Sequence, residues 1–209
     1  MITIFYIIVL VFSVIFHEIS HGYIALRLGD TTARDAGRLT LNPLRHIDLF
    51  GSILFPLLLA MSGAPVFGWA KPVPYDPRFL KNPKKASGLI ALAGPASNFS
   101  LAIIFAIFTR ILLAVGPDTA MTAKLYLFFY LIIEVNIALA IFNLLPIAPL
   151  DGSGVLFSLL PSSFAPVEQF LRRYGFIILI LLVTSGANFL SPLIGGLHSF
   201  LVGSQAPLL

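Results

Sequence analysis

Residues 2–26, ITIFYIIVLVFSVIFHEISHGYIAL, decide the fold class of this chain and carry one formal charge, Glu18. A helix of this length spans the roughly 30 Å hydrocarbon core of a bilayer. No basic residue precedes the apolar run and no small-x-small cleavage site follows it, which argues against a signal peptide. The stretch therefore predicts a retained membrane-spanning helix.

The composition of the whole chain indicates the same environment. Of 209 residues, 58% are apolar and 11% are charged, against roughly 45–50% and about 25% in soluble domains. Because so few charges cannot cover a soluble surface, a soluble globular protein is excluded. The absence of cysteine excludes a disulfide scaffold and a thiol nucleophile. We expect a lipid bilayer as the surroundings and no nucleic acid as partner; an oligomeric state is not predicted.

Several further apolar stretches predict an all-α polytopic membrane protein with about four to six membrane segments in a single domain, 1–209. The spans expected after the first are residues 86–112, 125–146 and 174–202. Residues 49–62 are too short for a regular span and contain Pro56, so a re-entrant segment is predicted there. The last stretch is compatible with one kinked span or with two helices broken near Gly186 or Ser191.

Two polar segments have a strand-like pattern. Residues 37–41 alternate weakly, and the proline-rich residues 71–76 suit an extended loop or an edge strand. We expect short β-strand-like segments here, close to the functional site.

Lys and Arg are distributed unevenly between the loops. With the amino terminus outside and 49–62 re-entrant, eleven of the thirteen basic residues face the cytoplasm. These are Arg27, Arg34, Arg38, Arg45, Lys71, Arg78, Lys81, Lys84, Lys85, Arg172 and Arg173, whereas Arg110 and Lys124 lie outside. The positive-inside rule favours this orientation.

His17, Glu18 and His21 form an HExxH motif within the first helix. Residues four apart share a helix face, so both imidazoles can bind one metal ion. Glu18 can then act on a metal-bound water as general base. A polar cluster that only pairs helices is the alternative, but the desolvation cost of these side chains makes it the weaker one.

A catalytic zinc usually takes three protein ligands, and two acids are candidates for the third. In the predicted topology the first span and 125–146 both run toward the cytoplasm. Asp151 then lies at the depth of the two histidines, whereas Glu134 lies roughly 25 Å away along its helix. Asp151 is therefore the predicted third ligand, and Glu134 has no assigned role.

Five segments, in this order, resemble the site-2 protease family of intramembrane zinc metalloproteases. They are HEISHG (17–22), GRLTLNPLRHID (37–48), GWAKPVP (68–74), ALAGPASN (91–98) and FNLLPIAPLDGSGVL (142–156). The resemblance covers roughly residues 10–160 and is greatest to small prokaryotic members without a PDZ domain. It implies one Zn²⁺ held by His17, His21 and Asp151, with Glu18 as catalytic base. It also implies cleavage of a transmembrane protein substrate near the cytoplasmic face of a prokaryotic inner membrane.

Asn98 and Asn143 fall within these family motifs on different spans. A buried amide can hold a substrate carbonyl or stabilise an oxyanion, and it can equally bond a neighbouring helix. We expect both to bind substrate, and segments 37–41 and 71–76 to clamp an unwound substrate strand. The alternative functions are a metal-binding membrane transporter and a non-catalytic membrane scaffold.

Overall fold

The computed structural model describes residues 2–63, 68–117, 119–185 and 190–203, and this part of the chain contains helices and no strand. The α-helices are α1 (Ile2–Arg27), α2 (Thr32–Asp35), α3 (Phe55–Ser62), α4 (Pro83–Val115), α5 (Ala120–Asn143), α6 (Asp151–Leu159), α7 (Ala165–Thr184) and α8 (Ser191–Val202). Leu49–Leu54 form a π-helical turn before α3, and the 3₁₀ turns are Pro43–Arg45, Pro77–Phe79 and Ser162–Phe164. The predicted all-α fold class is confirmed.

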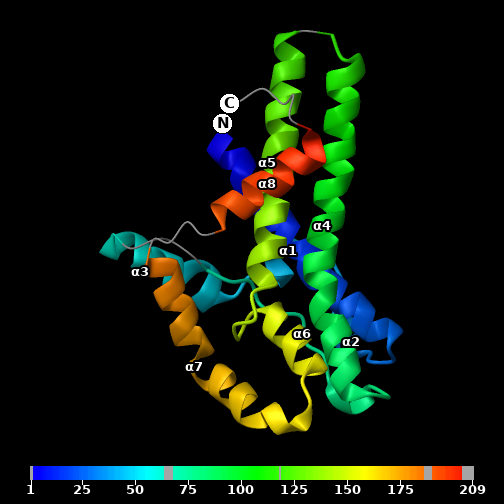
Figure 1. Ribbon diagram of the computed structural model, residues 1–209, viewed down its shortest axis with the longest axis vertical. Helices are drawn as coiled ribbons and strands as arrows, with labels where there is room; N and C mark the ends of the chain where they lie inside the picture. The colour runs from blue at the N-terminus through cyan, green and yellow to red at the C-terminus, as the bar shows by residue number, and fades with distance from the viewer. Residues whose placement is uncertain (1, 64–67, 118, 186–189, 204–209) are drawn as a thin grey trace.

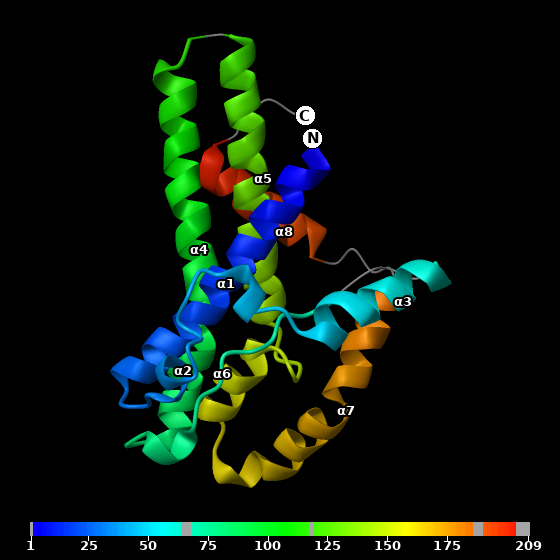
Figure 2. The ribbon, with the colours of Figure 1, turned by 180° about the vertical axis from the view of Figure 1, so that it is seen from behind.

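Three helices, α1, α4 and α5, are long and apolar enough to cross a membrane. In Figures 1 and 2, α4 and α5 run side by side and α1 crosses them, in agreement with the contacts between all three. Asn82 caps the start of α4 and Thr119 that of α5, because each side chain accepts a hydrogen bond from a backbone N–H in the first turn. Pro95 lies inside α4 without ending it.

The buried polar side chains of α1 lie on one stripe with a spacing of four residues. The stripe consists of Val9, Ser13, His17, His21 and Ala25, each less than 10% exposed, and Ile15, Ile19 and Gly22 are buried beside it. Large apolar side chains such as Ile4, Ile7 and Phe12 are exposed on the rest of the helix. Such an arrangement suits lipid, because apolar residues can face the hydrocarbon while polar ones are sequestered between helices.

A second stripe with the same spacing runs along α4. Its buried members are Ala86, Ile90, Gly94, Asn98, Ala102 and Ala106. Most of these are small, which permits close approach of neighbouring helices. The two stripes place the polar residues of α1 and α4 against one another inside the bundle.

The two less regular expected segments are both helical. Residues 49–62 form the π-turn and α3, which are tied to the following chain through Trp69: its backbone N–H donates to Gly51 O over 3.1 Å. Of the two alternatives left open for 174–202, the structure has the two helices, α7 and α8, and α7 begins nine residues earlier, at Ala165. Neither is among the helices long and apolar enough to cross a membrane. The break expected near Gly186 falls in 186–189, outside the described residues.

The structure has no strand in 37–41, so the strand-like interpretation of that segment is wrong, whereas 71–76 forms a loop, one of the two conformations expected for it. The segments nevertheless lie together. The Arg38 guanidinium donates through Nη2 to Lys71 O over 2.6 Å and to Pro72 O over 3.3 Å. Pro72 and Pro74 have no N–H to donate in a strand ladder. The carbonyls of Lys71 and Pro72 accept hydrogen bonds from the Arg38 side chain instead.

Candidate metal centre

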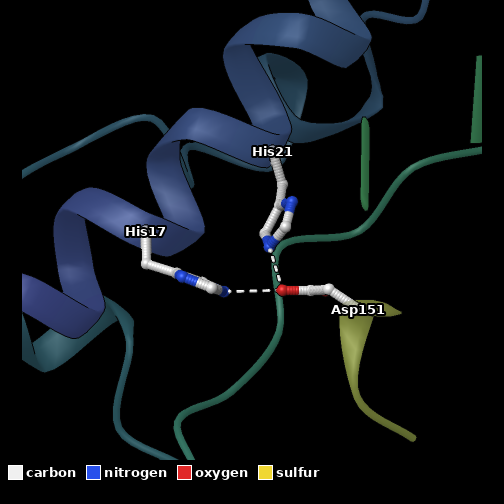
Figure 3. Close-up of side chains that lie close together, drawn as sticks. All are labelled: His17, His21 and Asp151. Atoms are coloured by element: carbon white, nitrogen blue, oxygen red, sulfur yellow. Dashed lines mark ion pairs between the residues drawn. The ribbon is translucent and has the colours of Figure 1, made fainter. Parts of the chain in front are cut away.

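His17 and His21 point from the buried stripe of α1 toward one carboxylate oxygen (Figure 3). His17 Nε2 lies 2.9 Å and His21 Nε2 lies 3.4 Å from Asp151 Oδ2. In the part of the chain that the structure describes, these residues form the one group of His, Asp and Glu side chains able to hold a metal ion, with ligand atoms within 4.8 Å of one another. Three residues that the sequence singled out are thus brought together.

Asp151 is the first residue of α6 and follows a loop after α5. In that loop, Ile147 N–H donates to Leu145 O over 2.8 Å and Leu150 N–H donates to Ile147 O over 2.9 Å. Gly152 packs so tightly that a Cβ there would collide with the carbonyl oxygens of Leu144 and Leu145. The Asp-Gly pair therefore lets the chain turn back sharply and return a carboxylate to α1.

The other ring nitrogen of each histidine is hydrogen-bonded. His21 Nδ1 lies 2.6 Å from Ile90 O, and His17 Nδ1 lies 2.7 Å from Asn98 Oδ1. A backbone carbonyl only accepts, so His21 carries its proton on Nδ1 and presents the lone pair of Nε2. Partners of this kind orient histidine ligands in metal sites.

The fit of a zinc ion to this group can be tested on the structure. Asp151 Oδ2 is buried without a hydrogen-bond partner, although the Nε2 atoms of both histidines face it. A cation bound between these three atoms would supply the missing partner. Two imidazole nitrogens and one carboxylate oxygen form a donor set typical of catalytic zinc. The residues fit.

Gly94 supplies the space beside the imidazoles. A Cβ at this position of α4 would lie 2.5 Å from His17 Cε1, His17 Nε2 and His21 Nε2. Only the absence of a side chain allows α4 to pass behind both rings at this distance. Gly94 was not among the residues expected at the site, although its place in the four-residue stripe of α4 is a usable signal.

Glu18 lies next to His17 along α1 and accepts a hydrogen bond from Val73 N–H, with N···Oε2 at 2.8 Å. The segment that carries Val73 is fastened a second time, where Asp76 N–H donates to Asp30 Oδ2 over 2.6 Å. Asp30 is fully buried and also accepts from the backbone and hydroxyl of Thr32. These bonds, together with those of Arg38, hold segment 71–76 against α1.

Arg78 and His46 lie near this segment and are not part of the metal group. Arg78 is exposed, and His46 is buried in a loop. The Arg78 guanidinium donates to both carboxylate oxygens of Asp76 and lowers the pKa of that carboxyl below its ordinary value. His46 lies in the loop after α2, where its Nε2 lies 2.8 Å from Thr40 O and its backbone carbonyl accepts from Lys71 N–H. His46 therefore braces the loop.

The two predicted substrate-binding amides occupy different positions. Asn98 is fully buried against His17. Asn143 is the last residue of α5, where its Nδ2 donates to Leu139 O of the same helix over 2.9 Å. Asn136, which the sequence analysis missed, is fully buried and bonded to Asn98; a second polar residue on an otherwise apolar face was the signal for it.

A histidine pair and a carboxylate on apolar helices, with a glutamate beside them, define an integral membrane metalloprotease. The sequence profile of peptidase family M50 matches residues 5–116 and 110–182. The chain belongs to this family and is a zinc metalloprotease of the site-2 type, with Zn²⁺ as its cofactor.

Named relatives agree with this assignment. "Putative zinc metalloprotease YwhC" of Bacillus subtilis is 41% identical over 85% of this chain and 80% of its own length. "Putative zinc metalloprotease Rip2" is 30% identical in Mycolicibacterium smegmatis and 31% in Mycobacterium tuberculosis, over 84% and 76% of this chain. The matches cover 65% and 60% of those two proteins, so this chain spans less than two thirds of their length. No solved structure gives a significant match.

Proposed function

We propose that this metalloprotease hydrolyses peptide bonds within transmembrane helices of membrane-protein substrates, near the cytoplasmic face. The observation that carries the proposal is the convergence of His17, His21 and Asp151 inside a bundle of apolar helices, with Glu18 beside them. A protease that acted on soluble chains would have no need to bury these side chains among membrane helices, where each costs desolvation energy.

In this proposal His17 Nε2, His21 Nε2 and Asp151 Oδ2 hold the zinc ion. When bound, zinc supplies Lewis acidity, which polarises the scissile carbonyl and lowers the pKa of water toward about 7. Glu18 accepts the proton released as water attacks the carbonyl carbon, and then donates it to the leaving amine nitrogen. The C–N bond breaks, the hydroxyl stays on carbon and the hydrogen ends on nitrogen.

The bond from Val73 to Glu18 supports the role of Glu18 as base. It engages Oε2, so Oε1 is left for the proton transfer, because an ionised carboxylate offers two accepting oxygens. Asn143 is proposed to hold a carbonyl of the substrate, because it lies at the end of α5 one short loop before Asp151. Segment 71–76 lies against Glu18, and we propose that it contacts the unwound substrate strand.

The proposed orientation has the amino terminus outside and the active site toward the cytoplasm of a prokaryotic inner membrane. Support comes from the basic residues, because the ends of α1 and α4 that flank the metal group carry Arg27, Lys84 and Lys85. The named relatives are bacterial proteins, which fits a prokaryotic membrane.

The test compares wild type with Glu18→Gln in liposomes. Each protein receives a reporter with a transmembrane helix and, separately, a soluble unfolded polypeptide. We expect wild type to cleave the membrane reporter preferentially. Glu18→Gln should retain zinc and lose roughly 10²–10⁴-fold in rate, the usual contribution of a general base. A chelator should abolish cleavage and added Zn²⁺ should restore it.

Glu134→Gln is the matched control, because it makes the same carboxyl-to-amide change on α5, away from the metal group. It should cleave as wild type does. Undiminished cleavage by Glu18→Gln would overturn the assignment of the base, and preference for the soluble polypeptide would overturn the substrate class.

A further inference from the structure

A chain of buried amides connects His17 to helices α4 and α5. Asn98 Nδ2 donates to Asn136 Oδ1 over 2.8 Å and to Ser13 O over 3.3 Å, while its Oδ1 faces His17 Nδ1 at 2.7 Å. Asn136 Nδ2 donates in turn to Ile132 O over 2.8 Å and to Ser13 Oγ over 2.9 Å. Asn98 and Asn136 are 0% exposed, so no bulk water replaces these partners.

Backbone carbonyls determine the direction of each hydrogen bond that links Asn136, Asn98 and His17. Ile132 O and Ser13 O are carbonyl oxygens, which only accept. They require the NH₂ group of each asparagine to face them, since a flipped amide would place oxygen against oxygen. Asn136 therefore presents Oδ1 to Asn98, and Asn98 presents Oδ1 to His17.

The last link determines the tautomer of His17. Because Asn98 Oδ1 only accepts, His17 must carry its proton on Nδ1, which leaves the Nε2 lone pair directed at Asp151 Oδ2 and the metal position. His21 reaches the same tautomer by one direct bond to Ile90 O. The two histidines thus differ. The tautomer of His21 depends on one backbone carbonyl of the neighbouring helix α4, whereas that of His17 depends on the two amides of Asn98 and Asn136 and so on the packing of three helices.

We propose that Asn98 and Asn136 are positioning residues that fix His17 in its metal-binding tautomer and rotamer. This inference rests on the proposed ligand role of His17. It assigns to Asn98 a direct function in positioning His17, and to Asn136 an indirect function through its hydrogen bond to Asn98. Because the links come from α1, α4 and α5, correct packing of the three long helices is also required for zinc binding.

The test measures zinc affinity of the purified full chain by chelator competition, together with the tautomer of the apo protein by ¹⁵N-histidine NMR. Only four histidines contribute signals. Asn98→Ala should raise the zinc Kd roughly 10–100-fold, the usual effect of losing a partner behind a histidine ligand. Asn136→Leu should raise it by less, because Asn98 keeps its 3.3 Å bond to Ser13 O and loses only the shorter bond to Asn136. With Asn98 held less firmly, His17 should change from one tautomer to a mixture.

Two further variants separate positioning from simple loss of stability. Asn136→Asp should rescue both readouts, because a buried, protonated carboxyl again offers an acceptor to Asn98 and a donor to Ile132 O. Thr109→Val changes an equally buried polar residue of α4 whose hydroxyl donates to Phe105 O of its own helix, and zinc affinity should not change.

Wild-type affinity and an unchanged His17 tautomer in both Asn98→Ala and Asn136→Leu would overturn the inference. An equal loss in Thr109→Val would also overturn it, because the effect would then be general. His17→Ala distinguishes failure of the underlying site: if its zinc affinity equals that of wild type, the proposed ligand set itself is wrong.

Discussion

Val73 N–H donates a hydrogen bond to Glu18 Oε2 over 2.8 Å, across 55 positions of sequence. The proposed base is thereby held by the backbone of a proline-rich segment instead of by another side chain. Neutral backbone donors orient a carboxylate at a smaller cost to its basicity than a cation would impose. The position of this segment therefore matters for the chemistry at Glu18.

Arg38 is one of the side chains that hold this segment, and its replacement should impair cleavage more than zinc binding. Arg38→Met removes charged donors from Lys71 O and Pro72 O, each worth about 1.5–3 kcal/mol. We expect cleavage of the membrane reporter to fall by roughly tenfold or more, with zinc Kd unchanged. Arg34→Met, on the exposed face of α2, is the control and should behave as wild type. A large rise in zinc Kd in Arg38→Met would contradict this prediction.

Gly94→Ala should weaken zinc binding directly. The new Cβ would lie 2.5 Å from both histidine rings, and relief of such overpacking typically costs about 1–3 kcal/mol, which corresponds to roughly 10–100-fold in zinc Kd. Gly196→Ala provides the comparison, because nothing lies within 4 Å of a Cβ there. It should leave zinc Kd unchanged and stabilise α8 by up to about 1 kcal/mol. Wild-type zinc affinity in Gly94→Ala would show that the rings do not occupy this position.

Asn143→Ala tests the amide at the end of α5. If this side chain stabilises charge on the substrate carbonyl, the cleavage rate should fall by roughly 10²–10³-fold, as for loss of one oxyanion donor, while zinc Kd stays constant. Ser100→Ala removes a side chain that likewise bonds the carbonyl four residues earlier in its own helix, Ala96 O at 2.8 Å. Equal rates for Asn143→Ala and Ser100→Ala would rule out a substrate role for Asn143.

The orientation in the membrane can be measured with single cysteines, since the chain has none. Lys81 lies just before α4 and Met121 near the start of α5, and both side chains are exposed. In intact spheroplasts, a membrane-impermeant thiol reagent should label Met121→Cys. Lys81→Cys should react only after permeabilisation, because it lies among the basic residues expected in the cytoplasm. The reverse labelling pattern would invert the proposed topology, and the cysteine-free parent gives the background.

The sequence brings the residues of the metal group together partly through local geometry and partly through the predicted topology. His17 and His21 share a face through the periodicity of one helix, and Asp151 follows from the depth at which the third long helix ends. The strand-like interpretation of 37–41 failed for a non-local reason. Its weak alternation carries no information about Arg38, whose guanidinium takes the carbonyls of Lys71 and Pro72 that a strand ladder would otherwise use.

By itself, the sequence determined the membrane environment, the three long helices and the residues of the metal group, because hydropathy and helical spacing are properties of contiguous chain. Only the tertiary structure decided which group hydrogen-bonds to the second ring nitrogen of each histidine ligand. Ile90 is 69 residues from His21, and Asn98 is 81 from His17. Hydrogen bonds of that sequence separation exist only once the buried stripes of α1 and α4 have packed in register, and only then does each imidazole acquire a defined tautomer.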